Sequence, residues 1–267
     1  MMSAYMVCQR RFWLRHVKDL TLKTRITPLE FGGAIHAALN TWFKSGSADK
    51  ALTSFKSAWE ACGGDCQEDQ KRTQAKAERI LKGYIAKYAQ EPFTVLANEK
   101  AFESVMPNGL TYIGRRDRVV NWQGAIYVLE HKTMSQLGYA TFNKFKPNLQ
   151  IDGYIYDAAK NDYPTCHGCV VDAILVAKTK EDYARKIETR TAEEIDTFPE
   201  LFDHITQAIQ NSLANDHWVP NYEMCTYYGA CPYRTMCMQP KELWQRIADT
   251  EYVVSHWDPR NIQEGGD

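Results

Sequence analysis

The chain lacks the sequence features of a membrane or secreted protein. Within its 267 residues, no apolar run approaches the roughly 20 residues of a bilayer-spanning helix. The first residues lead directly into Cys8-Gln9-Arg10-Arg11, with no apolar segment and cleavage site between them. These absences predict a cytoplasmic protein that does not bind membranes.

An excess of charge of one sign is also missing, since the formal net charge is -1. That balance neither favours nor excludes a nucleic-acid partner, because such proteins concentrate their basic residues locally. Taken alone, each local basic group is more typical of a solvated surface. Three such groups occur: Arg10, Arg11, Arg15, His16 and Lys18; Arg115, Arg116 and Arg118; and Lys144 and Lys146.

Internal repeats, low-complexity tracts and an ATP-binding loop are absent as well. Without a G-x-x-x-x-G-K-[ST] motif, any ATP-driven translocation would require a partner protein. The length and the hydrophobic fraction of 44% suit a single domain with a sizeable core. We divide this domain into an N-terminal segment 1–30, a core 31–215 and a Cys-rich tail 216–267.

Hydrophobic periodicity predicts helices that flank a group of strands. The expected helices cover residues 30–43, 48–60, 67–90, 147–159 and 193–213. Three strands are expected at 94–105, 110–122 and 125–133, and they form an antiparallel meander. The turn segments Pro107-Asn108-Gly109 and Gln123-Gly124 separate them. A buried fourth strand is expected at 170–178. This order predicts an α/β fold with a mixed central sheet flanked by helices.

Three charged residues stand on the second and third strands of this meander. Asp117 lies within the second strand, and Glu130 and Lys132 lie at the end of the third. Since side chains alternate between the faces of a strand, Glu130 and Lys132 point the same way and His131 points the opposite way. Antiparallel pairing can bring Asp117 next to Glu130. Glu-x-Lys alone is far more typical of an exposed ion pair; the apolar residues before it and the facing aspartate favour a functional site.

Two carboxylates and a lysine in this arrangement suit phosphodiester hydrolysis. Carboxylate oxygens are the ligands that Mg²⁺ and Mn²⁺ prefer, and the backbone carbonyl of His131 can add a further oxygen. The cation polarises the phosphate and lowers the pKa of a bound water. The lysine orients that water and offsets charge in the transition state. We therefore predict Asp117, Glu130 and Lys132 as catalytic residues.

The pattern Gly114-x-x-Asp117 followed by Glu130-x-Lys132 resembles the core of the PD-(D/E)XK nuclease superfamily, with Arg116 in place of the motif's proline. The resemblance implies a restriction-endonuclease-like fold and a metal-dependent DNA nuclease. It also implies an exonuclease that acts on DNA ends or single strands in recombination, repair or phage DNA processing, in a bacterial or phage-infected cell, with a helicase as a possible partner.

Two further matches are similar to the RecB-like branch of that superfamily. His36 follows Gly32 and Gly33, which we expect to permit a close approach of their helix to the sheet, and the resemblance implies that His36 binds the metal from this helix. Gln150 and Tyr154 stand one helical turn apart and match a Q-x-x-x-Y motif that contacts DNA. Taken alone, each match also has a non-functional explanation. His36 could be a hydrogen-bonded helix histidine, and Tyr154 could be a core residue. From the basic groups, we add Arg11 and Arg115 as expected DNA contacts.

The eight cysteines are distributed unevenly. In a reducing compartment they are more typical of ligands or buried thiols than of disulfides. Cys225, Cys231 and Cys237 are separated by five-residue gaps, whereas structural zinc sites use C-x-x-C pairs. We expect Cys166 and Cys169 to be inert thiols at a turn, and Cys62 and Cys66 to have no function.

RecB-like nucleases with a [4Fe–4S] cluster, such as AddB and CRISPR-associated exonucleases, take one cysteine ahead of the nuclease core and three behind it. This resemblance implies that Cys8, Cys225, Cys231 and Cys237 hold such a cluster, although zinc stays an alternative. The first gap is wider here than in those relatives, and the segment Gly229-x-Cys231-Pro232-Tyr233-Arg234 resembles one in phage-type relatives. A cluster would clasp the N-terminal segment to the C-terminal tail, which stabilises the fold by on the order of 4–5 kcal/mol.

Two other functions remain compatible with the sequence. The first is a catalytically inactive nucleic-acid-binding protein on the same fold, which the complete set of catalytic residues disfavours. The second is an iron–sulfur redox protein, which leaves the carboxylates and the lysine unexplained.

Overall fold

The computed structural model describes residues 1–24, 27–61, 69–227 and 230–260. The chain forms two compact units. Unit 1 comprises Met1–Thr24 and Pro199–Asp258, and unit 2 comprises Arg25–Phe198 and Pro259–Asp267. The catalytic residues predicted from the sequence all belong to unit 2, and the four predicted cluster cysteines all belong to unit 1.

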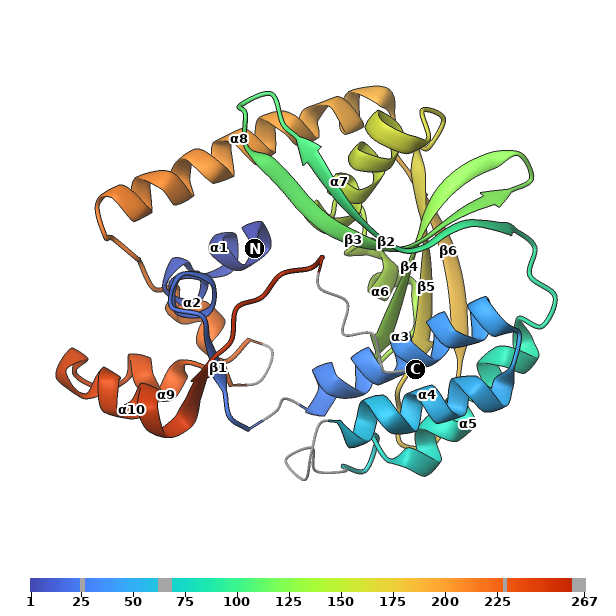
Figure 1. The fold of residues 1–267 in the computed structure, drawn as a ribbon, viewed down its shortest axis with the longest axis horizontal. Helices are drawn as coiled ribbons and strands as arrows, with labels where there is room; N and C mark the ends of the chain where they lie inside the picture. The colour runs from blue at the N-terminus through green and yellow to red at the C-terminus, as the bar shows by residue number, and fades with distance from the viewer. Residues whose placement is uncertain (25–26, 62–68, 228–229, 261–267) are drawn as a thin grey trace. The chain divides into compact units, whose positions relative to one another are not determined.

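A five-stranded mixed sheet forms the centre of unit 2 (Figure 1). Its strand order is β2-β3-β4-β5-β6, with β4 and β5 parallel and every other pair antiparallel. The strands are β2 (Thr94–Val105), β3 (Thr111–Trp122), β4 (Ala125–Met134), β5 (Gly168–Leu175) and β6 (Tyr183–Thr189). The predicted meander is therefore confirmed as β2, β3 and β4, and the predicted fourth strand as β5.

Turn residues join the strands of the meander where the sequence predicts them. Gly109 adopts a φ of 80°, and Gln123 and Gly124 adopt φ values of 53° and 87°. Two consecutive residues with positive φ form the tight turn whose twist matches an antiparallel hairpin, so β4 follows β3 directly. This hairpin brings Glu130 back alongside the strand that carries Asp117.

Helices cover both faces of the sheet, and apolar cores lie beneath them. One core lies beneath α3 (Thr27–Ser45), α4 (Ala48–Glu60) and α5 (Gln74–Lys87) and includes Ile174 of β5. The other lies beneath α6 (Tyr139–Asn143) and α7 (Leu149–Asp157) and includes Val128 and Val171. A π-helical turn (Ala158–Asp162) continues α7, and α8 (Ala192–Ala214) passes from unit 2 into unit 1.

Several predicted helix bounds are wrong, for reasons that lie in the capping residues. The helix expected over 67–90 begins only at Gln74, because the Thr73 hydroxyl caps it by accepting a hydrogen bond from the backbone N–H of Lys76. The helix expected from 147 begins at Leu149 after its cap Asn148. Cys62 and Cys66 lie outside the described residues. The sequence analysis also missed β6.

Unit 1 is built from both ends of the chain. Its β1 and β7 pair antiparallel, and its small core gathers Leu14, Tyr233, Met236 and Tyr252. Its elements are α1 (Met2–Val7), α2 (Gln9–Phe12), a π-helical turn (Trp13–Val17), β1 (Leu20–Leu22), α9 (Arg234–Cys237), α10 (Trp244–Glu251), β7 (Tyr252–Val254) and the 3₁₀ turns Tyr222–Cys225 and Lys241–Leu243. Within the described ranges, no helix is long and apolar enough to cross a bilayer.

Candidate active site

The predicted catalytic residues lie where β3 and β4 separate. The two strands pair from Trp122 and Ala125 as far as Arg118 and Leu129. One step further in the same register, Asp117 faces Glu130. Here a side-chain hydrogen bond takes the place of strand pairing, because Asp117 Oδ2 accepts a hydrogen bond from the backbone N–H of His131 at 2.8 Å. We call this point, where β3 and β4 separate beside Asp117 and Glu130, the fork; it holds the Asp117 carboxylate against the strand that carries Glu130.

A hydrogen-bonded network joins Glu130 and Lys132 to α7. Lys132 Nζ donates to Glu130 Oε1 at 2.6 Å and to Gln150 Oε1 at 2.9 Å. Gln150 Nε2 in turn donates to Glu130 Oε1 at 3.0 Å and to the Tyr154 hydroxyl at 3.1 Å. Four residues expected at the site from separate motifs therefore lie together, with Glu130 and Lys132 pointing the same way.

His36 reaches the same fork from α3. Its Nδ1 lies 3.6 Å from Asp117 Oδ2. The helix approaches β4 closely at Gly32, where an added Cβ would lie only 3.0 Å from the Thr133 hydroxyl oxygen. Gly33 faces open space, so the expectation that both glycines permit the close approach is wrong for that residue.

Burial shifts the pKa values of the two carboxyl groups and of the histidine at the fork. It raises the pKa of Glu130 to about 7, and the charge of Asp117 adds to this rise. It raises the pKa of Asp117 to about 6, with a further contribution from the charge of Glu99. Burial lowers the pKa of His36 to about 4, so its imidazole is neutral and available as a ligand. Perturbed carboxyl groups of this kind are typical of functional sites.

The donors at the fork suit a divalent cation. Glu130 Oε2 is buried and has no hydrogen-bond partner among the described residues, which is costly for a carboxylate unless a further group satisfies it. Across the described ranges, no group of three or more His, Cys, Asp or Glu side chains stands ready to hold a metal. Mg²⁺ does not require such a cage, because it binds through one or two carboxylates and keeps several waters. Asp117 and Glu130 would supply those carboxylates, and His36 lies beside them, with its Nδ1 3.6 Å from Asp117 Oδ2.

A family model described as "PD-(D/E)XK nuclease superfamily" matches residues 2–238. The chain belongs to this superfamily. The five-stranded mixed sheet flanked by helices agrees with the restriction-endonuclease-like fold of PD-(D/E)XK proteins. The family identifies the chain as a nuclease, and hence its substrate as a nucleic acid.

Among the 25 solved chains that match this one are two of low sequence identity. A protein named "Putative exonuclease" from Eubacterium rectale has a TM-score of 0.46 and 11% identity, covering 80% of this chain and 79% of that one. The protein SSO0001 has a TM-score of 0.37 and 14% identity, covering 89% of this chain and 96% of that one. No curated protein matches the sequence. The family match alone therefore carries the assignment.

Behind the PD-(D/E)XK fork, a buried polar network holds the His131 side chain on the opposite face of β4. Its Nδ1 lies 3.0 Å from Asp172, and its Nε2 contacts Arg118. Asp172 also accepts a hydrogen bond from the Tyr84 hydroxyl and lies 3.3 Å from Arg185. Burial lowers the pKa of His131 to about 3, so its ring is neutral. These contacts fix the backbone between Glu130 and Lys132.

The sequence analysis missed this network, although one signal for it was present. Asp172 interrupts an otherwise apolar strand, and every residue of that strand is buried. A carboxylate in such a position is retained only with partners.

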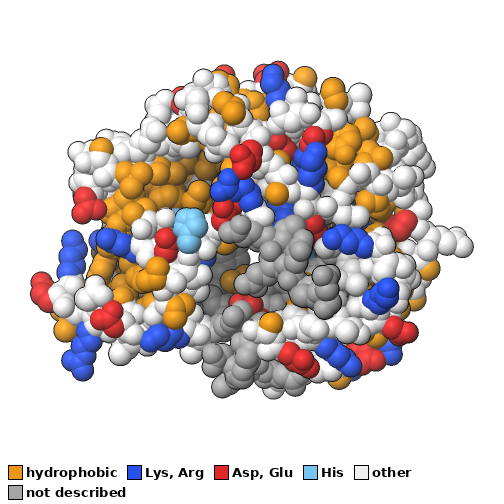
Figure 2. Space-filling view, in the orientation of Figure 1, with side chains coloured by type: hydrophobic (Ala, Val, Ile, Leu, Met, Phe, Trp, Pro, Cys, Tyr) orange, Lys and Arg blue, Asp and Glu red, His pale blue; other side chains and the backbone are white. Residues whose placement is uncertain are grey.

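The expected DNA contacts outside the fork belong to different units. Arg115 lies on β3 beside Asp117, with its Nε 3.4 Å from Glu99. Arg11 lies on α2 of unit 1. On the face shown in Figure 2, Lys and Arg side chains alternate with Asp and Glu side chains and form no single basic patch.

The four cysteines expected to bind a cluster gather in unit 1. The backbone N–H of Asn221 lies 3.4 Å from Cys8 Sγ, and the Cys225 thiol donates to the Asn221 carbonyl at 3.9 Å. Burial raises the pKa of Cys237 to about 11, and the neighbouring thiols of Cys231, Cys8 and Cys225 add to this rise. The other three thiols therefore lie close enough to act on the Cys237 thiol, although no three of the four are arranged as metal ligands.

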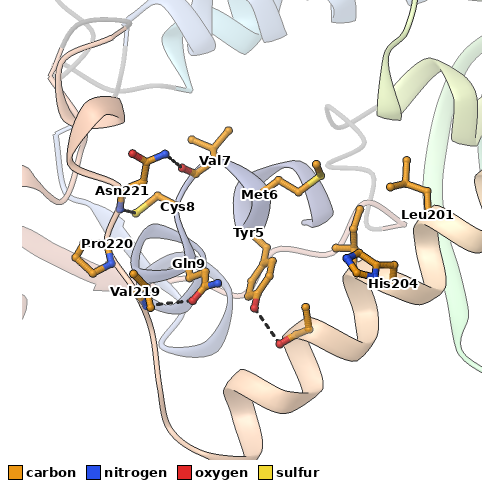
Figure 3. A pocket seen from close by; sticks show the side chains of 12 residues that line it. Tyr5, Met6, Val7, Cys8, Gln9, Leu201, His204, Val219, Pro220 and Asn221 are labelled. Atoms are coloured by element: carbon orange, nitrogen blue, oxygen red, sulfur yellow. Dashed lines mark hydrogen bonds between the residues drawn. The ribbon is translucent and has the colours of Figure 1, made fainter.

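Cys8 also lines an apolar hollow of unit 1 (Figure 3). Residues of α1 and α8 form its other walls, including Met6, Leu201 and Ile205. The Tyr5 hydroxyl links the two helices by donating a hydrogen bond to the Ala208 carbonyl at 2.9 Å.

Cys166 and Cys169 are buried in unit 2, and burial raises the pKa of both thiols, which makes them poor nucleophiles.

Proposed function

We propose that the protein is a DNA nuclease that depends on Mg²⁺ or Mn²⁺ and digests DNA from ends or as single strands. The observation that carries the proposal is the meeting of Asp117 and Glu130 at the fork, where one buried oxygen of Glu130 lacks a partner in the part of the chain that the structure describes. The family match supports hydrolysis of nucleic acid. Recombination, repair and phage DNA processing are the proposed settings, with a helicase as a candidate partner.

Each residue at the fork has a proposed role. Asp117, Glu130, His36 and the backbone carbonyl of His131 would hold the cation, which when bound polarises the phosphate and lowers the pKa of water. Lys132 would orient the attacking water and offset charge that develops on the phosphate. Its present contacts with Glu130 and Gln150 hold its ammonium beside the carboxylates.

Residues at the margin of the fork would position the DNA. Gln150 and Tyr154 share one face of α7 and are already bonded to each other and to the carboxylate network. Arg115 is about 30% exposed and can turn toward a phosphate. Arg11 of unit 1 is exposed and would contact a phosphate of the DNA backbone.

Digestion of end-labelled DNA tests the proposal. Wild-type protein with Mg²⁺ or Mn²⁺ should shorten labelled single-stranded or double-stranded DNA over time, and EDTA should stop the reaction. Asp117→Asn and Lys132→Ala should abolish digestion and leave the fold intact. Tight DNA binding without cleavage in either metal would instead support an inactive binding protein.

We also propose that Cys8, Cys225, Cys231 and Cys237 hold a [4Fe–4S] cluster that serves as a structural clasp. Support comes from their collection in one unit and from the effect of the other three thiols on the pKa of Cys237. A metal that binds thiolates would remove the cost of ionising neighbouring buried thiols. Iron content and visible absorbance of anaerobically purified protein test this; zinc without iron would refute the cluster. A cluster with a reversible potential in a protein without nuclease activity would support a redox function.

A further inference from the structure

His131 is linked to each side chain that would hold the cation, although its own side chain points to the opposite face of β4. It stands between Glu130 and Lys132 in the chain, and its backbone N–H donates to Asp117 Oδ2 at 2.8 Å. Its ring packs edge-on against the ring of His36, with the two centroids 5.8 Å apart. A shift of this one residue would therefore disturb the whole fork.

Strand pairing holds this segment of β4 on one side only. On the β5 side, residues 130–132 continue the parallel ladder with residues 171–173. On the β3 side, pairing ends at Leu129. Facing residues of an antiparallel pair can exchange both backbone hydrogen bonds, so the N–H and C=O of one strand residue point to the same side. The His131 carbonyl therefore points into the fork, together with the N–H that Asp117 accepts, at a place where pairing with β3 has ended.

The His131 side chain anchors this segment from the opposite face of the strand. Its Nε2 contacts Arg118 Nη1, and because a guanidinium can only donate, Nε2 accepts this hydrogen bond. Burial lowers the pKa of His131, so the neutral ring carries a single proton, on Nδ1. That nitrogen lies 3.0 Å from Asp172. With a partner at each nitrogen, the ring has one orientation and one tautomer.

Asp172 is itself held by contacts with two further elements. It is completely buried on β5, and it accepts a hydrogen bond from the Tyr84 hydroxyl of α5. Arg185 of β6 lies 3.3 Å away and makes two hydrogen bonds with Glu91. A buried carboxylate with these partners cannot turn without breaking several interactions at once.

Arg118 connects the same network to the helix that carries His36. Its Nε donates to Asn98 of β2 at 2.7 Å. Its guanidinium lies over the ring of Phe43, 3.3 Å from the centroid, and Phe43 belongs to α3. The network thus braces both the strand and the helix from which the proposed metal ligands project.

We propose that Asp172 is a positioning residue for the metal site: acting through His131, it sets the direction of the His131 carbonyl and the place of Glu130 beside Asp117, and thereby the affinity of the fork for Mg²⁺ or Mn²⁺. The inference rests on the proposed function, which places the cation among these groups. Residues that orient metal ligands without touching the metal change metal affinity or activity by roughly 10- to 100-fold when they are replaced.

Mn²⁺ binding to the full chain without DNA tests this inference independently of activity. Free Mn²⁺ is measured by electron paramagnetic resonance during titration of the wild type, Asp172→Ala, Tyr84→Phe and the control Tyr183→Phe. Asp172→Ala removes the acceptor that orients His131, and it should bind Mn²⁺ at least about tenfold more weakly than the wild type.

The two tyrosine variants form a matched pair that decides the question if Asp172→Ala does not fold. Tyr84 and Tyr183 are both buried and pack against each other, with ring centroids 5.7 Å apart. Each substitution removes one hydroxyl, which donates to Asp172 in Tyr84 and to the Ile80 carbonyl in Tyr183. Both should lower the midpoint of urea unfolding. Only Tyr84→Phe should also weaken Mn²⁺ binding, by a smaller factor than Asp172→Ala.

The other outcomes separate this inference from the proposed function. Wild-type Mn²⁺ affinity in folded Asp172→Ala or in Tyr84→Phe would overturn the positioning role and leave the metal-dependent nuclease standing. An equal loss of affinity in Tyr84→Phe and Tyr183→Phe would show that general loosening of the core weakens the site, which also overturns the inference. No Mn²⁺ binding to the wild type would overturn both.

Discussion

Replacing Glu130 by glutamine should make the metal-free protein more stable while it destroys the proposed activity. In the folded protein, burial and the charge of Asp117 raise the pKa of Glu130 from 4.5 to about 7. The folded state therefore holds this proton more tightly than the unfolded state does. As pH rises from the unfolded pKa to the folded pKa, the free energy of unfolding falls, and above the folded pKa the loss is complete.

The size of this loss follows from the pKa difference. Each pKa unit corresponds to about 1.4 kcal/mol, so the ionised Glu130 carboxylate destabilises the folded protein by about 3 kcal/mol near pH 8. A neutral glutamine of similar shape avoids that cost. Glu130→Gln should therefore raise the free energy of unfolding by about 3 kcal/mol near pH 8, and by much less near pH 4. Sites that bind ligands commonly sacrifice stability in this way.

Urea denaturation in EDTA at several pH values measures the effect. The gap between Glu130→Gln and the wild type should open as pH rises between the unfolded and folded pKa values, and saturating Mn²⁺ should close it by stabilising only the wild type. Glu103→Gln, an exposed change, should show no such gap. A variant less stable than the wild type near pH 8, or a gap independent of pH, would refute this reasoning.

Three further predictions have defined outcomes. Lys132→Met should lower kcat by about 10²- to 10³-fold without weakening Mn²⁺ binding in calorimetry, and wild-type turnover would contradict its role. Arg116→Met removes the guanidinium that lies 3.3 Å from the buried Asp157 carboxylate. Denaturation should show that the free energy of unfolding falls by about 3 kcal/mol or more. A fall below about 1 kcal/mol would contradict the pairing. Cys237→Ser should remove iron and visible absorbance and lower the melting temperature, whereas Cys166→Ser should keep both iron and absorbance.

The sequence was sufficient to predict the fork because its determinants are local. Turn residues at Gly109 and Gly124 set the hairpins, and alternation along a strand put Glu130 and Lys132 on one face. Once the hairpin between β3 and β4 was expected, the approach of Asp117 to Glu130 followed from strand pairing. Capping decided helix bounds that periodicity alone could not, as at Thr73.

The parts that were missed depend on contacts between distant segments. Tyr84 and Asp172 meet only when α5 packs on β5, and no local pattern specifies that contact. Glu99 could be placed opposite Asp117 only once the register between β2 and β3 was known, because that pairing contains an irregularity between Val95 and Ala97. An irregularity of one residue reverses which side chains share a face.

Diffraction from crystals soaked in Mn²⁺ tests the central claim most directly, because anomalous scattering locates the ion without reference to activity. The account predicts an anomalous peak at the fork of β3 and β4, within ligand distance of Asp117 and Glu130 carboxylate oxygens. A peak elsewhere in the chain, or an empty fork at saturating Mn²⁺ with Glu130 still bonded only to Lys132 and Gln150, would contradict it.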